Sequence, residues 1–309
     1  MHEHPNAVPR GLIAPIVTPF NERHEPLEHL YIQHAKWLLG NGCTALAPFG
    51  TTGEANSLSA AERCRLLEAL VDSGVSPDQL IPGTGCCSLA ETISLTKHAR
   101  ELGCCAVLML PPFYYKGVPD EGLYDYFSTV IDRLKDNHLR ILLYHIPQVS
   151  GVGFSLQLIE KLASAYPQII AGLKDSAGDW TFTASVIERC PSMSVFSGSE
   201  VFATKNVRAG GAGCISATGN INPQKIAALL KSSPSSGALE AQQALDAVRQ
   251  RVQELPLIAA IKFIVANYTS EPAWRNTRPP LLRLDEQPGA KLIDDLEGTL
   301  RYRWPTASH

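Results

Sequence analysis

Short apolar runs alternate with longer amphipathic segments along most of the chain, and this alternation constrains the fold more than any other feature of the sequence. Segments such as 27–39, 120–134 and 155–166 carry apolar residues at spacings of three and four, which is typical of helices that are buried on one face. The apolar runs between such segments have the length of strands. The runs that predict strands are 12–17, 45–48, 79–82, 106–110, 140–144, 169–173, 193–196 and 213–216.

Eight strands that alternate with helices predict an α/β protein with a parallel sheet. Eight such units favour a sheet closed into a (β/α)8 TIM barrel. The alternative is an open, doubly wound sheet. No Gly-rich GxGxxG stretch follows the first predicted strand, so the sequence favours the barrel.

The chain divides at a Ser/Gly/Pro-rich break within 231–240. We therefore expect a catalytic barrel over 1–233 and a C-terminal helical domain over 234–309. Within the second domain, 238–255 and 257–268 have helical spacing, and a further helix is predicted near 290–300.

Composition narrows the class of protein. The 309 residues carry a net charge of -3, and 45% of them are hydrophobic. This balance is typical of a globular enzyme and favours neither nucleic acid nor an anionic membrane as a partner. No apolar run approaches a membrane span, and the first ten residues do not resemble a signal peptide, so we expect a cytoplasmic protein. No CxxC spacing predicts a metal site, and we expect no metal.

Lys174 is the residue that most clearly points to chemistry. It ends the apolar run 169–173 and is followed at once by loop residues. Active sites of such barrels lie at the carboxyl ends of the strands. A lysine there could pair with Asp175 or Asp179, bind a phosphate, or attack a ketone to form a Schiff base. The last role requires a neutral amine, and burial disfavours the charged form of an amine.

Tyr144 ends the preceding predicted strand, one strand–helix unit before Lys174. Strand alternation places Tyr144 and Leu142 on one face, and His145 on the other, where we interpret it as a structural histidine. Tyr144 and Lys174 should lie at the same height on neighbouring strands. A phenol beside an amine suits imine chemistry, which moves protons at several steps. The alternative is an ordinary core tyrosine.

Two further loops follow predicted strands. Gly50, Thr51 and Thr52 belong to a turn whose hydroxyl and N–H groups suit a carboxylate or a phosphate, although such turns also simply cap helices. Ser199 and Glu200 follow the seventh strand, where they could bind hydroxyl groups of the distal part of a substrate. The glycines around 210–213 permit close backbone approach or only shape the barrel rim.

Together, "APIVTPF", "GTTGE", "LPPFYY", "YHIP", "GLKDSAGD" and "GGAGCISATGN" resemble the N-acetylneuraminate lyase and dihydrodipicolinate synthase family of class I pyruvate aldolases along nearly the whole chain. The resemblance implies a TIM barrel with a C-terminal helical domain, assembled as a homo-oligomer (tetramer or dimer). It implies an imine between Lys174 and pyruvate or another 2-keto acid, with proton transfer by Tyr144. Thr51 and Thr52 would bind the carboxylate, and Ile215 would offer a backbone contact.

The resemblance implies that a second tyrosine reaches the site from a neighbouring subunit, as Tyr114 or Tyr115, and we choose Tyr114. It also implies that the imine serves as electron sink, so no cofactor is expected. In the synthase branch an arginine stands where this chain has Val149, so the sequence is closer to the lyase branch. We expect a class I aldolase or lyase. The alternatives are dihydrodipicolinate synthase, which condenses pyruvate with aspartate semialdehyde, and a non-catalytic barrel that binds a keto acid.

Overall fold

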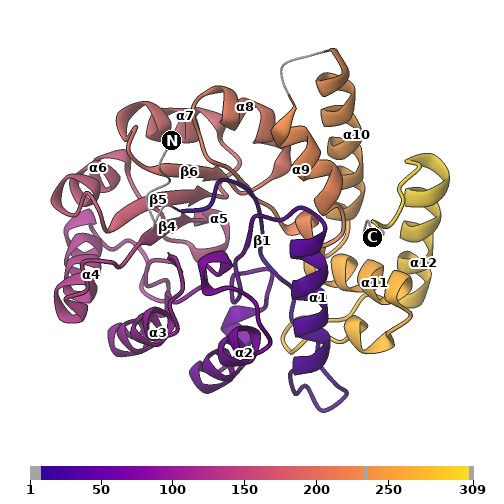
Figure 1. Cartoon of the computed structure of the whole chain (residues 1–309), viewed down its shortest axis with the longest axis horizontal. Helices are drawn as coiled ribbons and strands as arrows, with labels where there is room; N and C mark the ends of the chain where they lie inside the picture. The colour runs from indigo at the N-terminus through magenta and orange to yellow at the C-terminus, as the bar shows by residue number, and fades with distance from the viewer. Residues whose placement is uncertain (1–7, 233–235, 306–309) are drawn as a thin grey trace.

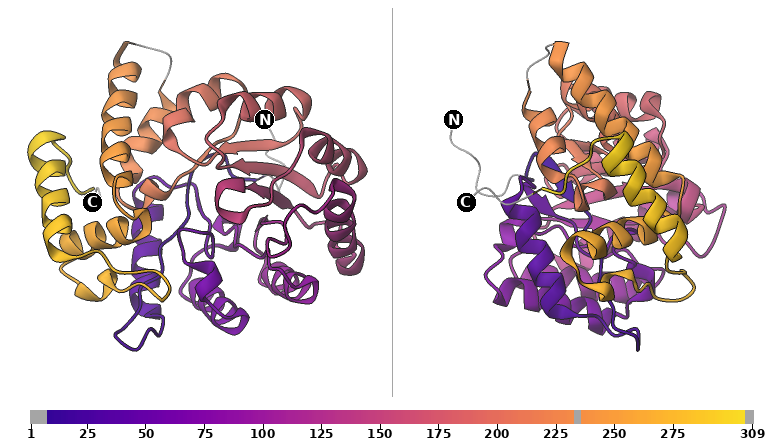
Figure 2. Two further views of the ribbon diagram at one scale, coloured as in Figure 1. Left: turned by 180° about the vertical axis from the view of Figure 1, so that it is seen from behind. Right: turned by 90° about the vertical axis from the view of Figure 1, so that its right-hand side faces the viewer.

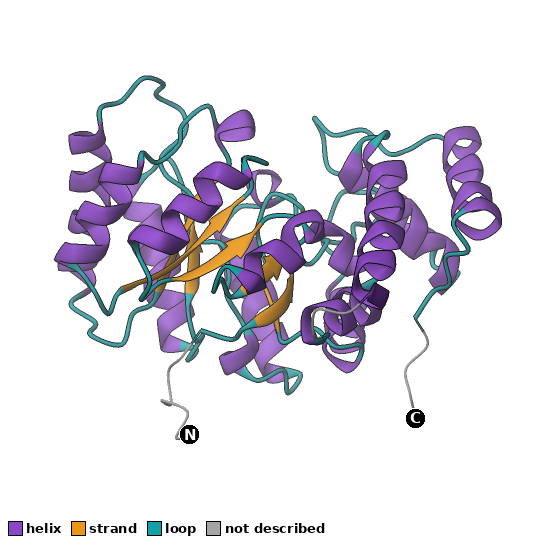
Figure 3. Cartoon of the chain, turned by 90° about the horizontal axis from the view of Figure 1, so that it is seen from above, coloured by secondary structure: helices purple, strands orange, loops and turns teal. Residues whose placement is uncertain are grey.

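A curled parallel sheet surrounded by helices forms the larger part of the computed structural model, which describes residues 8–232 and 236–305 (Figure 1). Its seven strands follow the order β2-β1-β7-β6-β5-β4-β3. Figure 3 shows these strands gathered within a layer of helices. The strands are β1 (Gly11–Ala14), β2 (Ala45–Leu46), β3 (Val107–Met109), β4 (Ile141–His145), β5 (Ile170–Asp175), β6 (Ser194–Ser197) and β7 (Gly213–Ile215).

The helices follow the predicted amphipathic segments closely. The first nine are α1 (Glu28–Gly40), α2 (Ala60–Asp72), α3 (Leu89–Glu101), α4 (Asp120–Leu134), α5 (Pro147–Ser150), α6 (Leu156–Ala165), α7 (Trp180–Arg189), α8 (Ala203–Arg208) and α9 (Pro223–Lys231). Then come α10 (Ser236–Gln253), α11 (Leu257–Thr269) and α12 (Glu286–Asp294), which begins before the predicted 290–300. Shorter turns include η3 (Glu200–Phe202), η4 (Ala217–Asn220) and a π-helical turn, η6 (Asp295–Thr299).

The predicted third strand, 79–82, does not form a regular strand in the structure. Leu80 forms an isolated bridge to Leu46 of β2, and Gly83, directly after the segment, forms one to Leu108 of β3. The N–H of Ile81 donates to the carbonyl of Leu46 (2.9 Å), and the N–H of Leu108 donates to the carbonyl of Pro82 (2.9 Å). These bonds join the two edges of the sheet. Pro82 has no N–H of its own, so the segment closes the barrel without forming a regular strand.

The interior of the barrel contains alternate residues of each strand. Leu142 and Tyr144 belong to the inner apolar cluster, whereas Leu143 packs outward against the helices, which confirms the predicted alternation. Gly172 in β5 allows the neighbouring strands to approach. A Cβ at this position would lie 2.3 Å from the carbonyl oxygen of Ser194 and 2.6 Å from the Leu142 side chain. Glycine at 172 therefore permits close contact across three strands.

The C-terminal helices pack directly on the barrel. Ile264 of α11 shares an apolar cluster with Val17, Leu30 and Ile221 from the barrel region. Figure 2 shows α11 beside α1, with α10 and α12 on the same side of the barrel. The expected boundary between residues 233 and 234 lies outside the described residues, so the division into domains stays a prediction. Among the residues that the structure describes, no helix has the length and apolar character needed to cross a membrane.

Candidate active site

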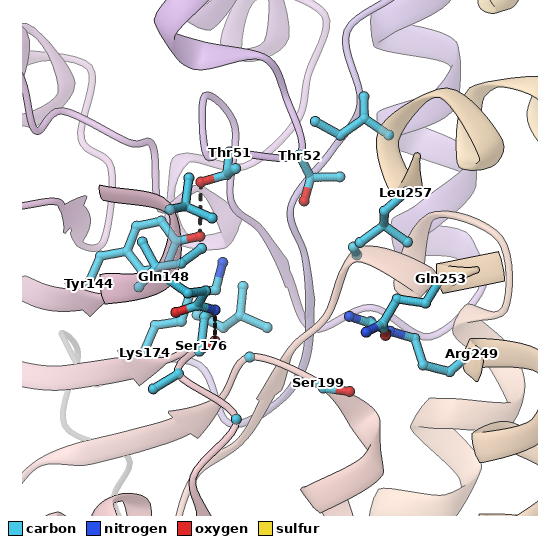
Figure 4. Close-up of a pocket in the computed structure, with 18 of the residues that line it drawn as sticks. Thr51, Thr52, Tyr144, Gln148, Lys174, Ser176, Ser199, Arg249, Gln253 and Leu257 are labelled. Carbon is cyan, nitrogen blue, oxygen red and sulfur yellow. Dashed lines mark hydrogen bonds between the residues drawn. The ribbon is translucent and has the colours of Figure 1, made fainter. Parts of the chain in front are cut away.

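A cavity of about 820 Å³ opens at the carboxyl ends of the strands, between the mouth of the barrel and the C-terminal helices. Figure 4 shows that side chains from both regions face each other across it. The barrel contributes, among others, Thr51, Thr52, Tyr144, Gln148, Lys174, Ser176, Ser199 and Ile215. The C-terminal region contributes Arg249, Gln253, Leu257, Thr277 and Leu282 among others.

Lys174 enters this cavity from β5. It is paired in the sheet with Tyr144 of β4 and with Phe196 of β6, which confirms that lysine and tyrosine are neighbours. The side chain is buried, and its Nζ lies 4.2 Å from the centre of the Tyr144 ring. Within residues 8–232 and 236–305, no hydrogen bond or ion pair joins this amine to another side chain. The amine therefore faces the aromatic ring and the cavity.

The two acids that could have paired with Lys174 are engaged elsewhere. Asp175 accepts hydrogen bonds from the Thr183 hydroxyl and from the N–H of Ala177 (2.8 Å). Asp179 caps α7 by accepting from the N–H of Thr181 (2.9 Å). The structural ion pair, one of the alternatives for Lys174, is thus absent from the described part of the chain.

Tyr144 connects the amine to the loop after β2. Its hydroxyl lies 3.1 Å from Oγ1 of Thr51, so the two groups share a hydrogen bond in which either can donate. Tyr144 itself is buried against the barrel interior. The phenol and the threonine hydroxyl thus form a hydrogen-bonded pair beside the Lys174 amine. Such a pair can take up and return protons next to Lys174.

The turn that contains Gly50, Thr51 and Thr52 presents free backbone donors. Its internal bonds include one from the N–H of Gly53 to the carbonyl of Gly50 (3.1 Å). The N–H groups of Thr51 and Thr52 donate to no atom of the described residues, although both residues line the cavity. Two adjacent free N–H groups beside a hydroxyl suit a carboxylate. Gly50 instead faces a small neighbouring cavity.

Glu54 stabilises this turn through buried polar contacts with the C-terminal region. Its backbone has a left-handed conformation (φ 58°). Its buried carboxylate accepts a hydrogen bond from Nζ of Lys262 in α11 (2.6 Å) and another from the N–H of Arg278 (2.9 Å). The C-terminal helices therefore help to fix the loop that carries Thr51.

His145 lies on the outer side of β4, consistent with its interpretation as a structural histidine. Its Nδ1 accepts from the N–H of Phe154 (3.0 Å), and its ring stacks on Phe182 with centroids 4.4 Å apart. Burial lowers the pKa of His145 and raises the pKa of nearby Asp175. These groups support β5 behind Lys174.

The remaining predicted site residues fall in different places. Ser199 and Ile215 line the cavity. Glu200 does not lie on its described wall. Its carboxylate is buried behind the wall, where it accepts from the hydroxyls of Ser216 and Thr218 and pairs with Arg249. Tyr114 is 74% exposed, on the loop before α4, and lies away from the cavity of its own chain.

Several residues that line the cavity were not predicted as site residues from the sequence. Gln148 of α5 and Ser176 of the loop after β5 meet only in the folded chain, where the Gln148 amide donates to the carbonyl of Ser176. Arg249, Gln253 and Leu257 come from the helical region, far along the chain from Lys174. No spacing rule connects that region with the ends of barrel strands.

A parallel barrel with a cavity at the carboxyl ends of its strands, lined there by Lys174, Tyr144 and Thr51, defines a TIM-barrel enzyme. Residues 8–298 match the model of the Dihydrodipicolinate synthetase family, and the chain belongs to that family. It is 35% identical over 288 residues to an uncharacterized DapA-like lyase of Chloroflexus aurantiacus, covering 93% of this chain and 95% of the relative. The chain is therefore a lyase of this family, as the sequence predicted.

Solved structures agree with this assignment. Dihydrodipicolinate synthase from Agrobacterium tumefaciens superposes with a TM-score of 0.86 at 29% identity, over 93% of this chain and 98% of the other. A prophage protein of the dihydrodipicolinic acid synthase family from E. coli K12, solved in complex with pyruvate, gives 0.86 at 28% identity, over 94% and 98%.

Proposed function

We propose that this protein is a class I aldolase or lyase in which Lys174 forms a Schiff base with pyruvate or another 2-keto acid. One observation carries the proposal. The buried amine of Lys174 has no acidic partner among the described residues and lies 4.2 Å from the centre of the Tyr144 ring. A nucleophilic amine needs this combination of burial and a nearby proton carrier.

Each neighbouring group has a role in this chemistry. The carboxylate of the keto acid binds the free N–H groups of Thr51 and Thr52, which brings its keto carbon to Lys174. Tyr144 donates and accepts protons as the carbinolamine forms and loses water, and Thr51 extends the proton path through their 3.1 Å contact. In carbon–carbon cleavage the protonated imine accepts the electron pair of the broken bond and becomes an enamine. In loss of water it accepts the electron pair of a C–H bond on the adjacent carbon, and the enamine then expels the hydroxyl group, which leaves with a proton as water. This reaction requires no metal or organic cofactor.

Borohydride trapping tests the proposal. The protein is incubated with pyruvate and borohydride, and the modified residue is located by peptide mass mapping. We expect one reduced pyruvate adduct, on Lys174, and none in Lys174→Ala. Lys161→Ala, which removes an exposed lysine of α6, serves as the matched control and should retain the adduct. An adduct that persists in Lys174→Ala would overturn the proposal.

The synthase reaction is the second candidate, because relatives carry that name. A 4-hydroxy-tetrahydrodipicolinate synthase of Rhodospirillum centenum is 36% identical over 215 residues, covering 69% of this chain and 72% of the relative. Val149, on the rim of the cavity, offers no charge to a second carboxylate. We expect no ring formation from pyruvate and aspartate semialdehyde while imine trapping persists. Binding of keto acids without turnover of any would favour the non-catalytic barrel.

We also infer that the protein works in the cytoplasm as a homo-oligomer, a dimer or a tetramer. Tyr114 and Tyr115 support this inference. Each is 74% exposed, and their rings contact one another edge to face at 5.4 Å. Large exposed aromatic residues are typical of interfaces. Light scattering on the wild type and on Tyr114→Ser tests the assembly, and a wild-type monomer at micromolar concentration would contradict it.

A further inference from the structure

The end of the cavity opposite Lys174 contains a buried arginine with unused hydrogen-bonding capacity. Arg249 of α10 is 8% exposed. Its Nε donates to Oε1 of Gln253 (2.6 Å), and its Nη1 donates to the Ser216 hydroxyl (3.0 Å) and to Glu200 (3.3 Å). Its Nη2 makes no hydrogen bond to any residue that the structure describes. This nitrogen is not sealed in the protein interior but faces the cavity, so a ligand there can supply its acceptor.

Gln253 adds a second donor at the same place. Because its Oε1 accepts from Arg249, the group that remains free is its amide NH2. Figure 4 shows the polar ends of both side chains together, turned toward the cavity and facing Lys174 and Tyr144 across it. Two neighbouring donors, one of them on a cation, match the two oxygens of a carboxylate.

Charge at the cavity wall favours an anion. Lys174 and Arg249 are the basic residues among those that line it, and Asp175 is the acidic one. The Asp175 carboxylate is satisfied by Thr183 and Ala177. Glu200 offsets part of the arginine charge, but it binds Nη1 from behind the wall and leaves the cavity side open. No carboxylate of the described residues therefore occupies the free donors.

Apolar side chains make up most of the wall between the two ends, although Ser176, Ser199 and Thr277 also line the cavity. The apolar side chains include Val149, Val201, Phe202, Leu257 and Leu282. Hydroxyl groups placed against these apolar side chains would lose water without gaining hydrogen bonds, which is unfavourable. A cavity of about 820 Å³ also exceeds the needs of a three-carbon keto acid. The shape and chemistry fit a longer molecule with an apolar middle.

We propose that Arg249 and Gln253 form a distal carboxylate clamp, and that the substrate is a 2-keto acid whose apolar chain ends in a second carboxylate. This inference rests on the proposed function for the position of the keto group near Lys174. The far carboxylate accepts from Nη2 of Arg249 and from the amide of Gln253. α10 thus determines substrate specificity, while the barrel strands carry the chemistry.

Paired ligands of equal length test the clamp. The wild type is titrated by calorimetry with 2-oxoadipate against 2-oxohexanoate, 2-oxopimelate against 2-oxoheptanoate, and 2-oxosuberate against 2-oxooctanoate. For the pair whose length spans the cavity, we expect the diacid to bind about tenfold more tightly or better. In Gln253→Glu the new carboxylate pairs with Arg249 and repels an anion. The ratio of diacid affinity to monoacid affinity should therefore fall close to one. Arg249→Lys, which keeps a cation beside Glu200, should reduce the ratio as well.

Gln250→Glu is the matched control, because it adds the same charge at an exposed position of the same helix and should preserve the ratio. Equal binding of monoacid and diacid at every length would overturn the proposal. Tighter binding of a polyhydroxylated 2-keto acid than of every diacid, or a ratio unchanged in Gln253→Glu, would also overturn it.

Borohydride trapping in the same samples keeps the two proposals apart. Selective binding of diacids without any trapped adduct would support the clamp and refute the imine. Trapping on Lys174 without preference for diacids would support the imine and refute the clamp.

Discussion

Tyr144 connects more of the site than any other residue, because its ring lies against the Lys174 amine while its hydroxyl meets Thr51. A phenylalanine at this position would preserve the ring and its packing in the barrel interior. The two functions of the tyrosine can therefore be separated by removing one oxygen atom.

We predict that Tyr144→Phe lowers kcat for pyruvate release by about 10²–10⁴-fold, because the proton carrier is lost. The rate is measured on whichever 2-keto acid the wild type cleaves. Tyr126→Phe is the matched control, since the Tyr126 hydroxyl also bonds a threonine, Thr92 (2.6 Å), but lies outside the cavity. An unchanged kcat in Tyr144→Phe would show that another group moves the proton.

At the scale of elements, buried polar contacts join the loop after β2 to the C-terminal helices. Lys262 of α11 and Glu54 are both fully buried, with Nζ and Oε1 2.6 Å apart. Burial lowers the pKa of Lys262 to about 8, although the Glu54 carboxylate acts in the opposite direction. A buried pair of this kind orients the two elements, and loss of either partner leaves the other unsatisfied.

We predict that Lys262→Met lowers the free energy of unfolding by about 3–5 kcal/mol, because it leaves the Glu54 carboxylate buried without its cation. Denaturant unfolding followed by circular dichroism measures the change. Lys97→Met, at an exposed position of α3, should alter stability by less than about 0.5 kcal/mol. The double variant with Glu54→Gln should recover part of the loss, and no recovery would contradict this account.

A second contact joins the loop near residue 278 to α2. Arg278 binds both oxygens of Glu62, at 2.9 Å and 2.8 Å. These hydrogen bonds lower the pKa of Glu62 to about 2 from an ordinary value of 4.5. A carboxyl group with a lowered pKa in the folded state stabilises the fold above its ordinary pKa, and this contribution is lost as pH falls toward the lowered value.

We therefore predict that stability falls between about pH 4.5 and pH 2 with a component that Glu62→Gln removes. The component should be roughly 1 kcal/mol at low salt and smaller at high salt, since the pair is partly exposed. Thermal unfolding across this pH range measures it. Identical pH profiles for the wild type and the variant would show that the contact adds nothing to stability.

For the whole molecule, the C-terminal helices are part of the core and of the site. Their apolar cluster includes Val17, Leu30 and Ile221 from the barrel region, and their side chains close one side of the cavity. The apolar surface that they cover would be exposed to water in a barrel expressed alone.

We predict that a chain ending at residue 232 loses cooperative unfolding and binds a hydrophobic dye, because that surface is uncovered. Differential scanning calorimetry and dye fluorescence provide the measurements, with the full chain as control. A truncated barrel with one sharp transition near that of the full chain would show that the barrel is stable by itself.

The sequence determined the features that depend on local patterns. Alternating hydrophobicity predicted the α/β class and all the barrel strands except the bridge segment 79–82. The repeat of one strand and one helix predicted that Tyr144 and Lys174 would be neighbours, and the sheet register confirms this. Alternation along β4 also predicted which side chains face the interior.

Only the tertiary structure decided the rest. The contact between Glu54 and Lys262, the burial of Glu200 behind the wall and the place of Arg249 at the far end of the cavity join segments with no common period. Local periodicity follows from backbone geometry, which each short segment carries by itself. Contacts between distant segments depend on how complete helices pack, so they become visible only when the chain is folded.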